Sequence, residues 1–256
     1  MGRVAAHAFA LLVVGAAAGP AKPRAVAKAP PCPRGMVEVR GEYCPSLEQV
    51  CARWMPPERG SPPRCAEFEP TLPCAGPTVA RHFCVDKYEF PNRAGKKPVV
   101  MTTWREAQEL CRGNGKRLCK DSEWTVACEG AEHLPYPYGL VRDESACNID
   151  KPSIDVDAKA LSAPATRAKE VARLWQGEPS GSRKACVSPY GVFDMTGNVD
   201  EWVVNESGRP FRSASKGGYW GRVRDACRPM TTAHDETFPF YQTGFRCCAD
   251  PTPPRP

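Results

Sequence analysis

Residues 190–202 read YGVFDMTGNVDEW, which places acidic side chains around a glycine-containing turn. Asp194 and Glu201 offer carboxylates, and the turn at Gly197 and Asn198 can aim backbone carbonyls inward. Carboxylate and carbonyl oxygens are the ligands that calcium prefers. The stretch therefore predicts either a calcium-binding turn or a tight turn whose acids cap amides or face solvent.

Two short helices are expected upstream of this stretch. Residues 103–106 (TWRE) form a capping box, in which the Thr103 hydroxyl and the Glu106 carboxylate satisfy free backbone amides. A second helix is expected to have Asp121 as its cap and Gly130 as its end. The inward faces are predicted to consist of Trp104, Ala107, Leu110 and Cys111 in the first helix and Trp124, Ala127 and Cys128 in the second.

The remaining sequence favours short strands within irregular backbone. Strand-like runs occur at 193–195 and 202–204, and residues 36–39 alternate in character, so we expect this last run to join the main sheet. Glycine (21) and proline (28) are frequent between such runs. The pattern indicates an α+β protein with little regular secondary structure.

The N-terminus has the features of an export signal. Arg3 precedes an apolar run at 4–14 and small residues at 15–18, which suit signal-peptidase cleavage. Because no later stretch approaches ~20 apolar residues, we expect no transmembrane segment after cleavage; a retained N-terminal anchor is the alternative. We interpret residues 1–18 as a signal peptide, 19–31 as a Pro/Ala-rich linker and 251–256 as a Pro-rich tail.

All fourteen cysteines follow the predicted signal. An even number of cysteines in an exported chain predicts disulfide bonds, and the protein is expected to be periplasmic or secreted. Residues 32–78 carry five of the cysteines, many prolines and few bulky aliphatic side chains. Crosslinks must replace a large core in this cysteine-rich segment.

Charge and histidine spacing exclude several classes of partner. Lysine plus arginine (35) exceed aspartate plus glutamate (29) by 6, but the basic residues are scattered. Without a basic run, no nucleic-acid partner is expected. His82, His133 and His234 are isolated, so no zinc site is expected.

Four segments occur in an order that resembles a known family. They are VDKYEFPN at 85–92, GKRL at 115–118 leading to Glu123 and Trp124, the stretch 190–202, and KGG at 216–218 closing with GFR at 244–246. Together they resemble the formylglycine-generating enzyme, or sulfatase-modifying factor, family. The resemblance implies a C-type-lectin-like, disulfide-rich domain over residues 79–250, with a small twisted sheet and two flanking helices.

The same resemblance implies two disulfides, Cys111–Cys247 and Cys128–Cys227. Among themselves, Cys119, Cys147, Cys186 and Cys248 allow three pairings, of which Cys147–Cys186 is favoured.

The resemblance also implies calcium ligands. They would be the side chains of Asp194 and Glu201 and the carbonyls of Gly197 and Val199. A second calcium site would use Asn148 and the Ile149 carbonyl, but its acidic partner is not evident, and the candidates Asp155, Asp157 and Glu178 are all imperfect.

Oxidases of this family bind copper through two cysteines shortly after the Gly-Gly pair. Here residues 219–226 read YWGRVRDA and contain none, and Cys227 matches a bridge position. Because thiolates select copper(I), we expect no copper-dependent formylglycine formation. This sequence also departs from the family's Gly-Asn-x-Trp-Glu-Trp pattern, because Asp200 stands in place of the first tryptophan.

The residues that replace the copper site suggest a binding surface. Tyr219, Trp220, Arg222 and Arg224 could hold a peptide carboxylate or a sugar. The alternative is that Trp220 belongs to the core and the arginines are solvated.

These observations lead to three hypotheses on function. The first is an exported, calcium-stabilised binding or scaffold module that recognises an exported protein, a peptide or a glycan. The second is a divergent oxidoreductase that modifies a side chain on an exported protein, so enzymatic activity is left open. The third makes the cysteine-rich segment the recognition element.

Overall fold

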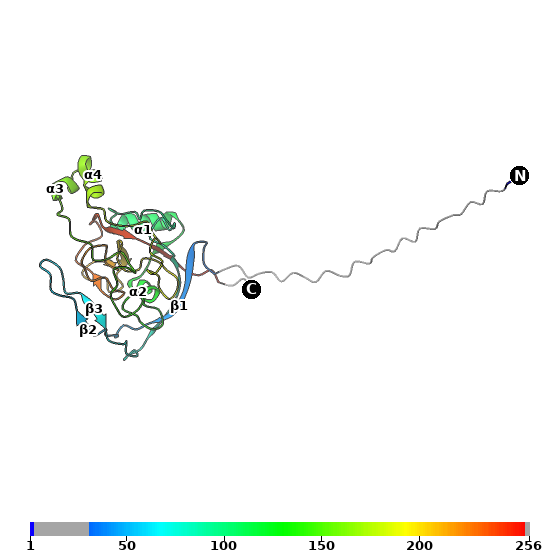
Figure 1. Ribbon diagram of the computed structural model, residues 1–256, viewed down its shortest axis with the longest axis horizontal. Helices are drawn as coiled ribbons and strands as arrows, with labels where there is room; N and C mark the ends of the chain where they lie inside the picture. The colour runs from blue at the N-terminus through cyan, green and yellow to red at the C-terminus, as the bar shows by residue number, and fades with distance from the viewer. Residues whose placement is uncertain (3–30, 254–256) are drawn as a thin grey trace.

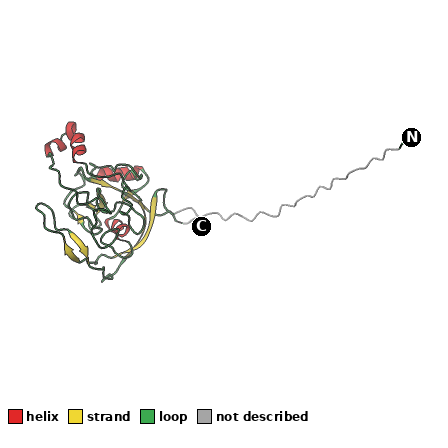
Figure 2. Ribbon diagram, viewed as in Figure 1, coloured by secondary structure: helices red, strands yellow, loops and turns green. Residues whose placement is uncertain are grey.

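The computed structural model describes residues 1–2 and 31–253. Nearly all of the predicted signal peptide and linker, and the end of the Pro-rich tail, lie outside the described residues (grey in Figure 1). The described chain is α+β, with short helices and strands joined by long loops (Figure 2), and this confirms the expected fold class.

One four-stranded sheet joins the cysteine-rich segment to the main domain. Its order is β1 (Met36–Tyr43), β4 (Val79–Asp86), β10 (Cys247–Ala249) and β5 (Arg117–Leu118). β1 pairs antiparallel with β4 along its whole length. The prediction that residues 36–39 join the main sheet is therefore confirmed, and the strand continues to Tyr43.

A second four-stranded sheet has the order β8 (Met230–Thr231), β7 (Ser213–Lys216), β6 (Asp200–Val204) and β9 (Thr243–Phe245). β6 is antiparallel to β7 and parallel to β9. The strand predicted at 202–204 is thus confirmed and begins two residues earlier. The strand predicted at 193–195 is wrong: Asp194 has a φ of 58°, which interrupts extended backbone, and only an isolated bridge between Phe193 and Val187 forms.

The two expected helices are α1 (Trp104–Gly113) and α2 (Asp121–Glu129). The capping box of α1 is present, because the Glu106 amide donates to Thr103 Oγ1 at 3.1 Å and the Thr103 amide donates to Glu106 Oε2 at 2.8 Å. Leu110 was expected inward but is 38% exposed, since it lies at the edge of the buried face. Asp121 is not the cap of α2: Lys120 precedes it, and the Lys120 amide donates to Glu123.

A pair of helices that we did not expect from the sequence, α3 (Ala158–Ser162) and α4 (Pro164–Leu174), projects at the upper left of Figure 1. The Asp157 side chain caps α3, and Pro164 occupies the first turn of α4, where its missing N–H costs nothing. Leu161 and Leu174 pack into a buried cluster with Trp220. None of the described helices is long and apolar enough to cross a bilayer.

Seven disulfides use all fourteen cysteines. The three pairings expected from the sequence, Cys111–Cys247, Cys128–Cys227 and Cys147–Cys186, are all present, together with Cys119–Cys248. In the cysteine-rich segment, Cys44–Cys74 and Cys51–Cys65 crosslink the region around a hairpin of β2 (Cys51–Trp54) and β3 (Cys65–Phe68). Cys32–Cys84 ties the start of this segment to β4.

Candidate functional site

β6 sends its first two side chains, Asp200 and Glu201, to opposite faces of the sheet, because side chains alternate along a strand. The Glu201 face packs against α2 through Val203 and Trp124. Trp202, on the Asp200 face, packs against α1. Glu201 is buried in the closed core, whereas Asp200 lines a cleft at the end of the strand.

The cleft has a volume of about 480 Å³ and lies where the chain leaves β7. Gly217 and Gly218 line it with φ values of 89° and 72°, a region that favours glycine. A Cβ atom at Gly218 would lie 2.2 Å from the buried Asp225 Oδ1. Pro62 and Pro63 of the cysteine-rich segment also line the cleft, so both parts of the chain form it.

Asp200 is the acidic side chain of this cleft. Burial raises the pKa of Asp200 to about 7, and the neighbouring Glu201 raises it further. Contacts with the Ser215 side chain, the Gly218 amide and the charge of Arg224 lower it by less. With this pKa, the Asp200 carboxyl is expected to change its protonation state near neutral pH.

Two residues of the predicted binding surface lie at this cleft. Tyr219 lines it and is mostly buried; burial raises the pKa of its hydroxyl, with smaller effects from Tyr241 and Asp200. Arg224 is exposed and lines the same cleft. An aromatic ring and a guanidinium therefore flank Asp200.

The other two residues of the predicted surface do not face the cleft. Trp220 is only 1% exposed and packs edge-on against Trp175, so it belongs to the core, as the alternative interpretation held. Arg222 forms an ion pair with Glu58, and its Nε donates to the Asp150 carbonyl at 3.4 Å. The binding surface expected at four residues is thus reduced to Tyr219 and Arg224.

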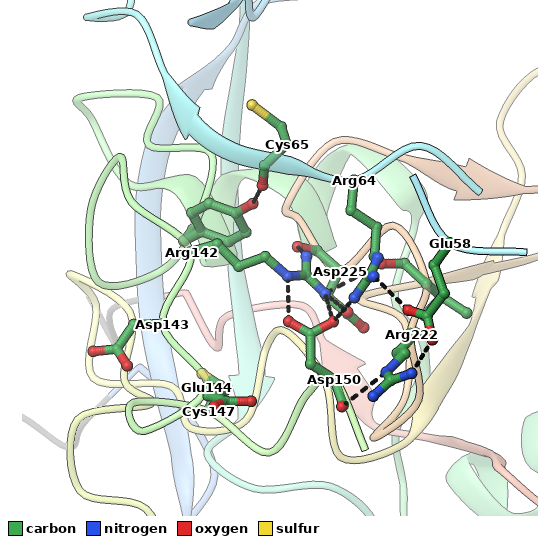
Figure 3. A network of polar contacts seen from close by, with 12 residues as sticks. Glu58, Arg64, Cys65, Arg142, Asp143, Glu144, Cys147, Asp150, Arg222 and Asp225 are labelled. Carbon is green, nitrogen blue, oxygen red and sulfur yellow. Dashed lines mark hydrogen bonds and ion pairs between the residues drawn. The ribbon is translucent and has the colours of Figure 1, made fainter. Parts of the chain in front are cut away.

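Arg222 belongs to a charged network that fastens the cysteine-rich segment to the main domain (Figure 3). Its members are Glu58, Arg64, Arg142, Asp150, Arg222 and Asp225. Arg64 bridges the two parts of the chain, since it donates to Glu58 at 2.9 Å and also pairs with Asp150. Arg142 donates to Asp150 at 2.6 Å and pairs with Asp225. The wall of the cleft that contains Pro62 and Pro63 is held by these contacts.

On the Glu201 face of the sheet, the carboxylate of Glu201 already has hydrogen-bond donors on both of its oxygens. The Arg246 guanidinium donates to Glu201 through Nε at 2.6 Å and through a terminal nitrogen at 2.5 Å. Trp124 Nε1 donates to the same carboxylate at 2.7 Å. Arg246 also donates to the carbonyls of Asp86 and Phe193, so its charge is fully embedded in the core.

Two further buried carboxyls lie near this pair. Burial, followed by the charges of Asp194 and Glu201, raises the pKa of Glu89 well above its ordinary value, and Glu89 accepts hydrogen bonds from Ser180 and Asn198. Burial also raises the pKa of Asp194 to about 6, while the Gly181 amide donates to its Oδ2 at 2.7 Å. A single guanidinium, that of Arg246, faces the three carboxyls of Glu201, Glu89 and Asp194. The raised pKa values of Glu89 and Asp194 favour their protonated forms, which lowers the excess negative charge.

The expected calcium ligands Asp194, Gly197, Val199 and Glu201 do lie around one turn, but their donor set fits calcium poorly. Both oxygens of Glu201 already accept hydrogen bonds from Arg246 or Trp124. Among the described residues, no group of three or more His, Cys, Asp or Glu side chains is arranged to hold a metal ion. A guanidinium supplies the positive charge that calcium would bring.

The second expected calcium site has a better-suited atom. Asn148 Oδ1 is buried and has no hydrogen-bond partner in the described part of the chain, while its Nδ2 donates to Gln176 and Asn198. Oδ1 and the adjacent Ile149 carbonyl are oxygen donors of the kind that a calcium ion takes. Of the acidic candidates, Glu178 is paired with Arg183 at 2.7 Å and Asp157 caps α3. Asp155 is exposed and forms no ion pair among the described residues.

Comparison with known proteins identifies the fold and the family. Residues 67–251 match the FGE-sulfatase family, the sulfatase-modifying factor enzyme 1-like domain. The chain belongs to this family. The matched range of the sulfatase-modifying factor domain begins within β3, inside the cysteine-rich segment.

Curated relatives carry different names. A serine/threonine-protein kinase, pkn1 of Chlamydia caviae, is 30% identical over 172 residues, covering 59% of this chain and 24% of that protein. The formylglycine-generating enzyme of Thermomonospora curvata is 28% identical over 60% of this chain and 56% of its own length. Inactive C-alpha-formylglycine-generating enzyme 2 of Bos taurus is 28% identical over 47% of this chain and 35% of its own length. The chain spans between 24% and 56% of the length of these three curated relatives.

Solved structures agree on the fold. PvdO from Pseudomonas aeruginosa has a TM-score of 0.51 and 15% identity, over 88% of this chain and 100% of that one. Treponema denticola variable protein 1 has a TM-score of 0.52 and 12% identity, over 84% of this chain and 95% of that one. The C-type-lectin-like sulfatase-modifying factor fold expected from the sequence is thereby confirmed.

Sequence reasoning missed several features of this sulfatase-modifying factor domain's cleft. The family resemblance places Asp200 beside the expected binding surface, as a replacement for tryptophan, but does not identify it as the acidic group of the cleft. Gln242, which lines the cleft with an unpartnered buried Oε1, lies in no motif. Pro62 and Pro63 come from a segment whose docking depends on long-range pairs such as Glu58 with Arg222, 164 residues apart.

Proposed function

We propose that this protein is an exported, disulfide-stabilised binding module of the sulfatase-modifying factor family without copper-dependent cysteine oxidase activity. The cleft beside Gly217 and Gly218 would receive an exported peptide partner. The observation that carries this proposal is that all fourteen cysteines are used in disulfides. No thiolate is left in the chain to bind copper(I), and the segment after Gly218 contains no cysteine before Cys227, which bonds to Cys128.

The disulfides also support export. Seven crosslinks, four of them within the main domain, are typical of proteins that fold in an oxidising compartment. The features of residues 1–18 are those of a signal peptide. Periplasmic or secreted location follows from the two observations together as part of the proposal.

The test has two parts on the full chain purified from an oxidising compartment. Thiol titration in denaturant should find no free thiol, and elemental analysis should find no stoichiometric copper after copper(I) loading and dialysis. A displayed peptide library should then yield ligands whose binding is lost in the Tyr219→Ala/Arg224→Ala double variant. The control is Arg105→Ala, which removes an exposed arginine of α1 that does not line the cleft. Retained binding in the double variant would show that the cleft is not the site, and glycan binding in place of peptide binding would change the partner class.

Calcium is proposed at Asn148 and Ile149 rather than at Glu201. The unpartnered Asn148 Oδ1 supports this choice, and a bound ion would satisfy an acceptor that is otherwise buried alone. Adding 2 mM calcium to chelator-treated protein should raise Tm by roughly 2–4 °C, as ~1 kcal/mol does for a domain of this size. The rise should disappear in Asn148→Ala and persist in Asp194→Asn; the opposite pattern would return calcium to the 190–202 turn.

One observation favours an enzymatic alternative. Asp200 lines the cleft, and burial raises its pKa to about 7, a value that suits a general acid or base. A divergent oxidoreductase would consume dioxygen with a peptide substrate and change that peptide's mass, and Asp200→Asn would abolish both. Unchanged peptide mass and no oxygen uptake across the peptides that bind would remove this alternative.

A further inference from the structure

The residues that line the cleft include a carboxylate without an ion-pair partner in the described part of the chain, Asp200, and an amide side chain whose oxygen has no hydrogen bond there, Gln242. Within residues 31–253, Asp200 forms no ion pair, whereas Asp150, Asp225 and Glu201 each do. Gln242 Oε1 is buried and has no hydrogen-bond partner among the same residues. The two residues are neighbours across the sheet, since the Asp200 amide donates to the Gln242 carbonyl at 2.9 Å. Both line the cleft.

We propose that this cleft recognises a cationic group, an ammonium or guanidinium such as that of a lysine or arginine side chain, through the Asp200 carboxylate and Gln242 Oε1. The inference rests on the proposed peptide-binding function and specifies what the peptide must carry. A cation with several N–H donors would satisfy both acceptors at once when the Gln242 side chain turns its buried Oε1 toward the cleft. The Tyr219 ring, which lies beside them, adds a face on which a cation is favoured.

The charges around Asp200 agree with a cationic ligand. Glu201, behind it on the same strand, raises the pKa of Asp200, and Asp200 in turn raises the pKa of Asp225, whose own shift is dominated by burial. Three acids thus crowd one region, and two of them already have arginine partners. Asp200 is the acid whose countercharge is missing from the protein.

The basic groups near the cleft do not supply that countercharge. Arg224 is exposed and has the weakest of the effects on the pKa of Asp200. Lys216 is buried, and its Nζ donates to the Arg228 carbonyl at 2.9 Å and lies over Trp124, on the Glu201 face. His234 stacks on Phe238 with ring centroids 3.9 Å apart.

Binding of a cation must then be linked to proton release. With the pKa of Asp200 at about 7, the free carboxyl is roughly half protonated at pH 7, and a cation binds only the ionised form well. The side chains of lysine and arginine stay charged up to pH 9, so the ligand does not titrate in this range. Affinity should therefore be constant above pH 8 and fall roughly thirtyfold by pH 5.5.

The experiment measures binding of three capped amino-acid amides to the full-length protein by NMR titration. The probes are N-acetyl-lysine amide, N-acetyl-arginine amide and the uncharged N-acetyl-norleucine amide, at pH 5.5, 7 and 8.5. We expect only the two cations to bind, with the stated pH dependence. Asp200→Asn should weaken both at least tenfold and flatten the pH profile, and Gln242→Leu should weaken them by less. The control Asp143→Asn removes one exposed carboxylate outside the cleft and should change neither.

The outcomes separate this inference from the proposed function. Equal binding by Asp200→Asn, or selection of norleucine or of acidic peptides, would overturn the cation assignment while leaving a peptide-binding cleft. Failure of the folded wild-type protein to bind any probe or any library peptide would overturn both. Binding that is weaker in Asp200→Asn but keeps the wild-type pH dependence would show that Asp200 acts only on the shape of the cleft. That result would also overturn the inference.

Discussion

Asp200 and Glu201 are consecutive residues that both carry a carboxyl group, yet their surroundings on the two faces of β6 are different. Glu201 is enclosed by Arg246 and Trp124, with donors at 2.5–2.7 Å to both of its oxygens. Asp200 opens into a cleft and has no ion-pair partner in the described chain. The difference teaches that strand alternation, rather than residue type, separates a structural carboxylate from one available to a ligand.

The largest expected effect on the free energy of unfolding comes from breaking the buried ion pair between Arg246 and Glu201. Arg246→Met removes a countercharge but leaves Glu201 buried, which typically costs ~3–5 kcal/mol of unfolding free energy. Chemical denaturation at pH 7 would measure it. The double variant Arg246→Met/Glu201→Gln should recover a large part of that loss, because no unpaired charge remains. A single variant that lost under ~1 kcal/mol would show that Glu201 does not depend on Arg246.

The second prediction uses the pH dependence of the open face. Because the pKa of Asp200 is raised to about 7 in the folded protein, its ionisation opposes folding, and stability is lost as pH rises from about 4 to about 7. Asp200→Asn has no such group. The unfolding free energy of the wild type minus that of the variant should fall by about 2–4 kcal/mol between pH 4 and pH 8 and then level off. A difference independent of pH would place the pKa of Asp200 at its ordinary value.

Parts of both faces follow from the sequence because they depend on local chemistry. The capping box of α1 and the strand at 36–39 are local patterns, and the pairings Cys111–Cys247 and Cys128–Cys227 came from the family resemblance. The partner of Glu201 was not predicted, although Arg246 lies in the quoted GFR segment. Nothing in a linear pattern shows that a guanidinium 45 residues away will occupy both carboxylate oxygens.

The cleft was less predictable because distant segments build it. Pro62 and Pro63 reach it only through docking of the cysteine-rich segment, and Gln242 reaches it through a parallel strand pair. Trp220 and Arg222 lie next to Tyr219 in sequence, yet the first turns into the core and the second toward Glu58. Irregular backbone between β7 and β8 has no fixed period, so side-chain directions could not be derived there.

The smallest expected effect concerns the turn after β7, and it tests whether Gly218 is required for the shape of the cleft. Gly218→Ala would place a Cβ atom 2.2 Å from Asp225 Oδ1 at a φ of 72°, so Asp225 or the turn must move, at a cost of roughly 1–3 kcal/mol. Gly113→Ala is the matched control, since its Cβ meets nothing within 4 Å and no positive φ is required. That variant should be neutral or slightly stabilising because alanine favours helix. The Gly218 amide contacts Asp200, whereas Arg246 binds Glu201 on the other face of β6. Gly218→Ala should therefore weaken lysine-amide binding. The stability losses caused by Gly218→Ala and by Arg246→Met should be additive. Equal stabilities for the two glycine variants, measured by denaturation, would mean that the turn is pliable and that the cleft's shape is not fixed by Gly218.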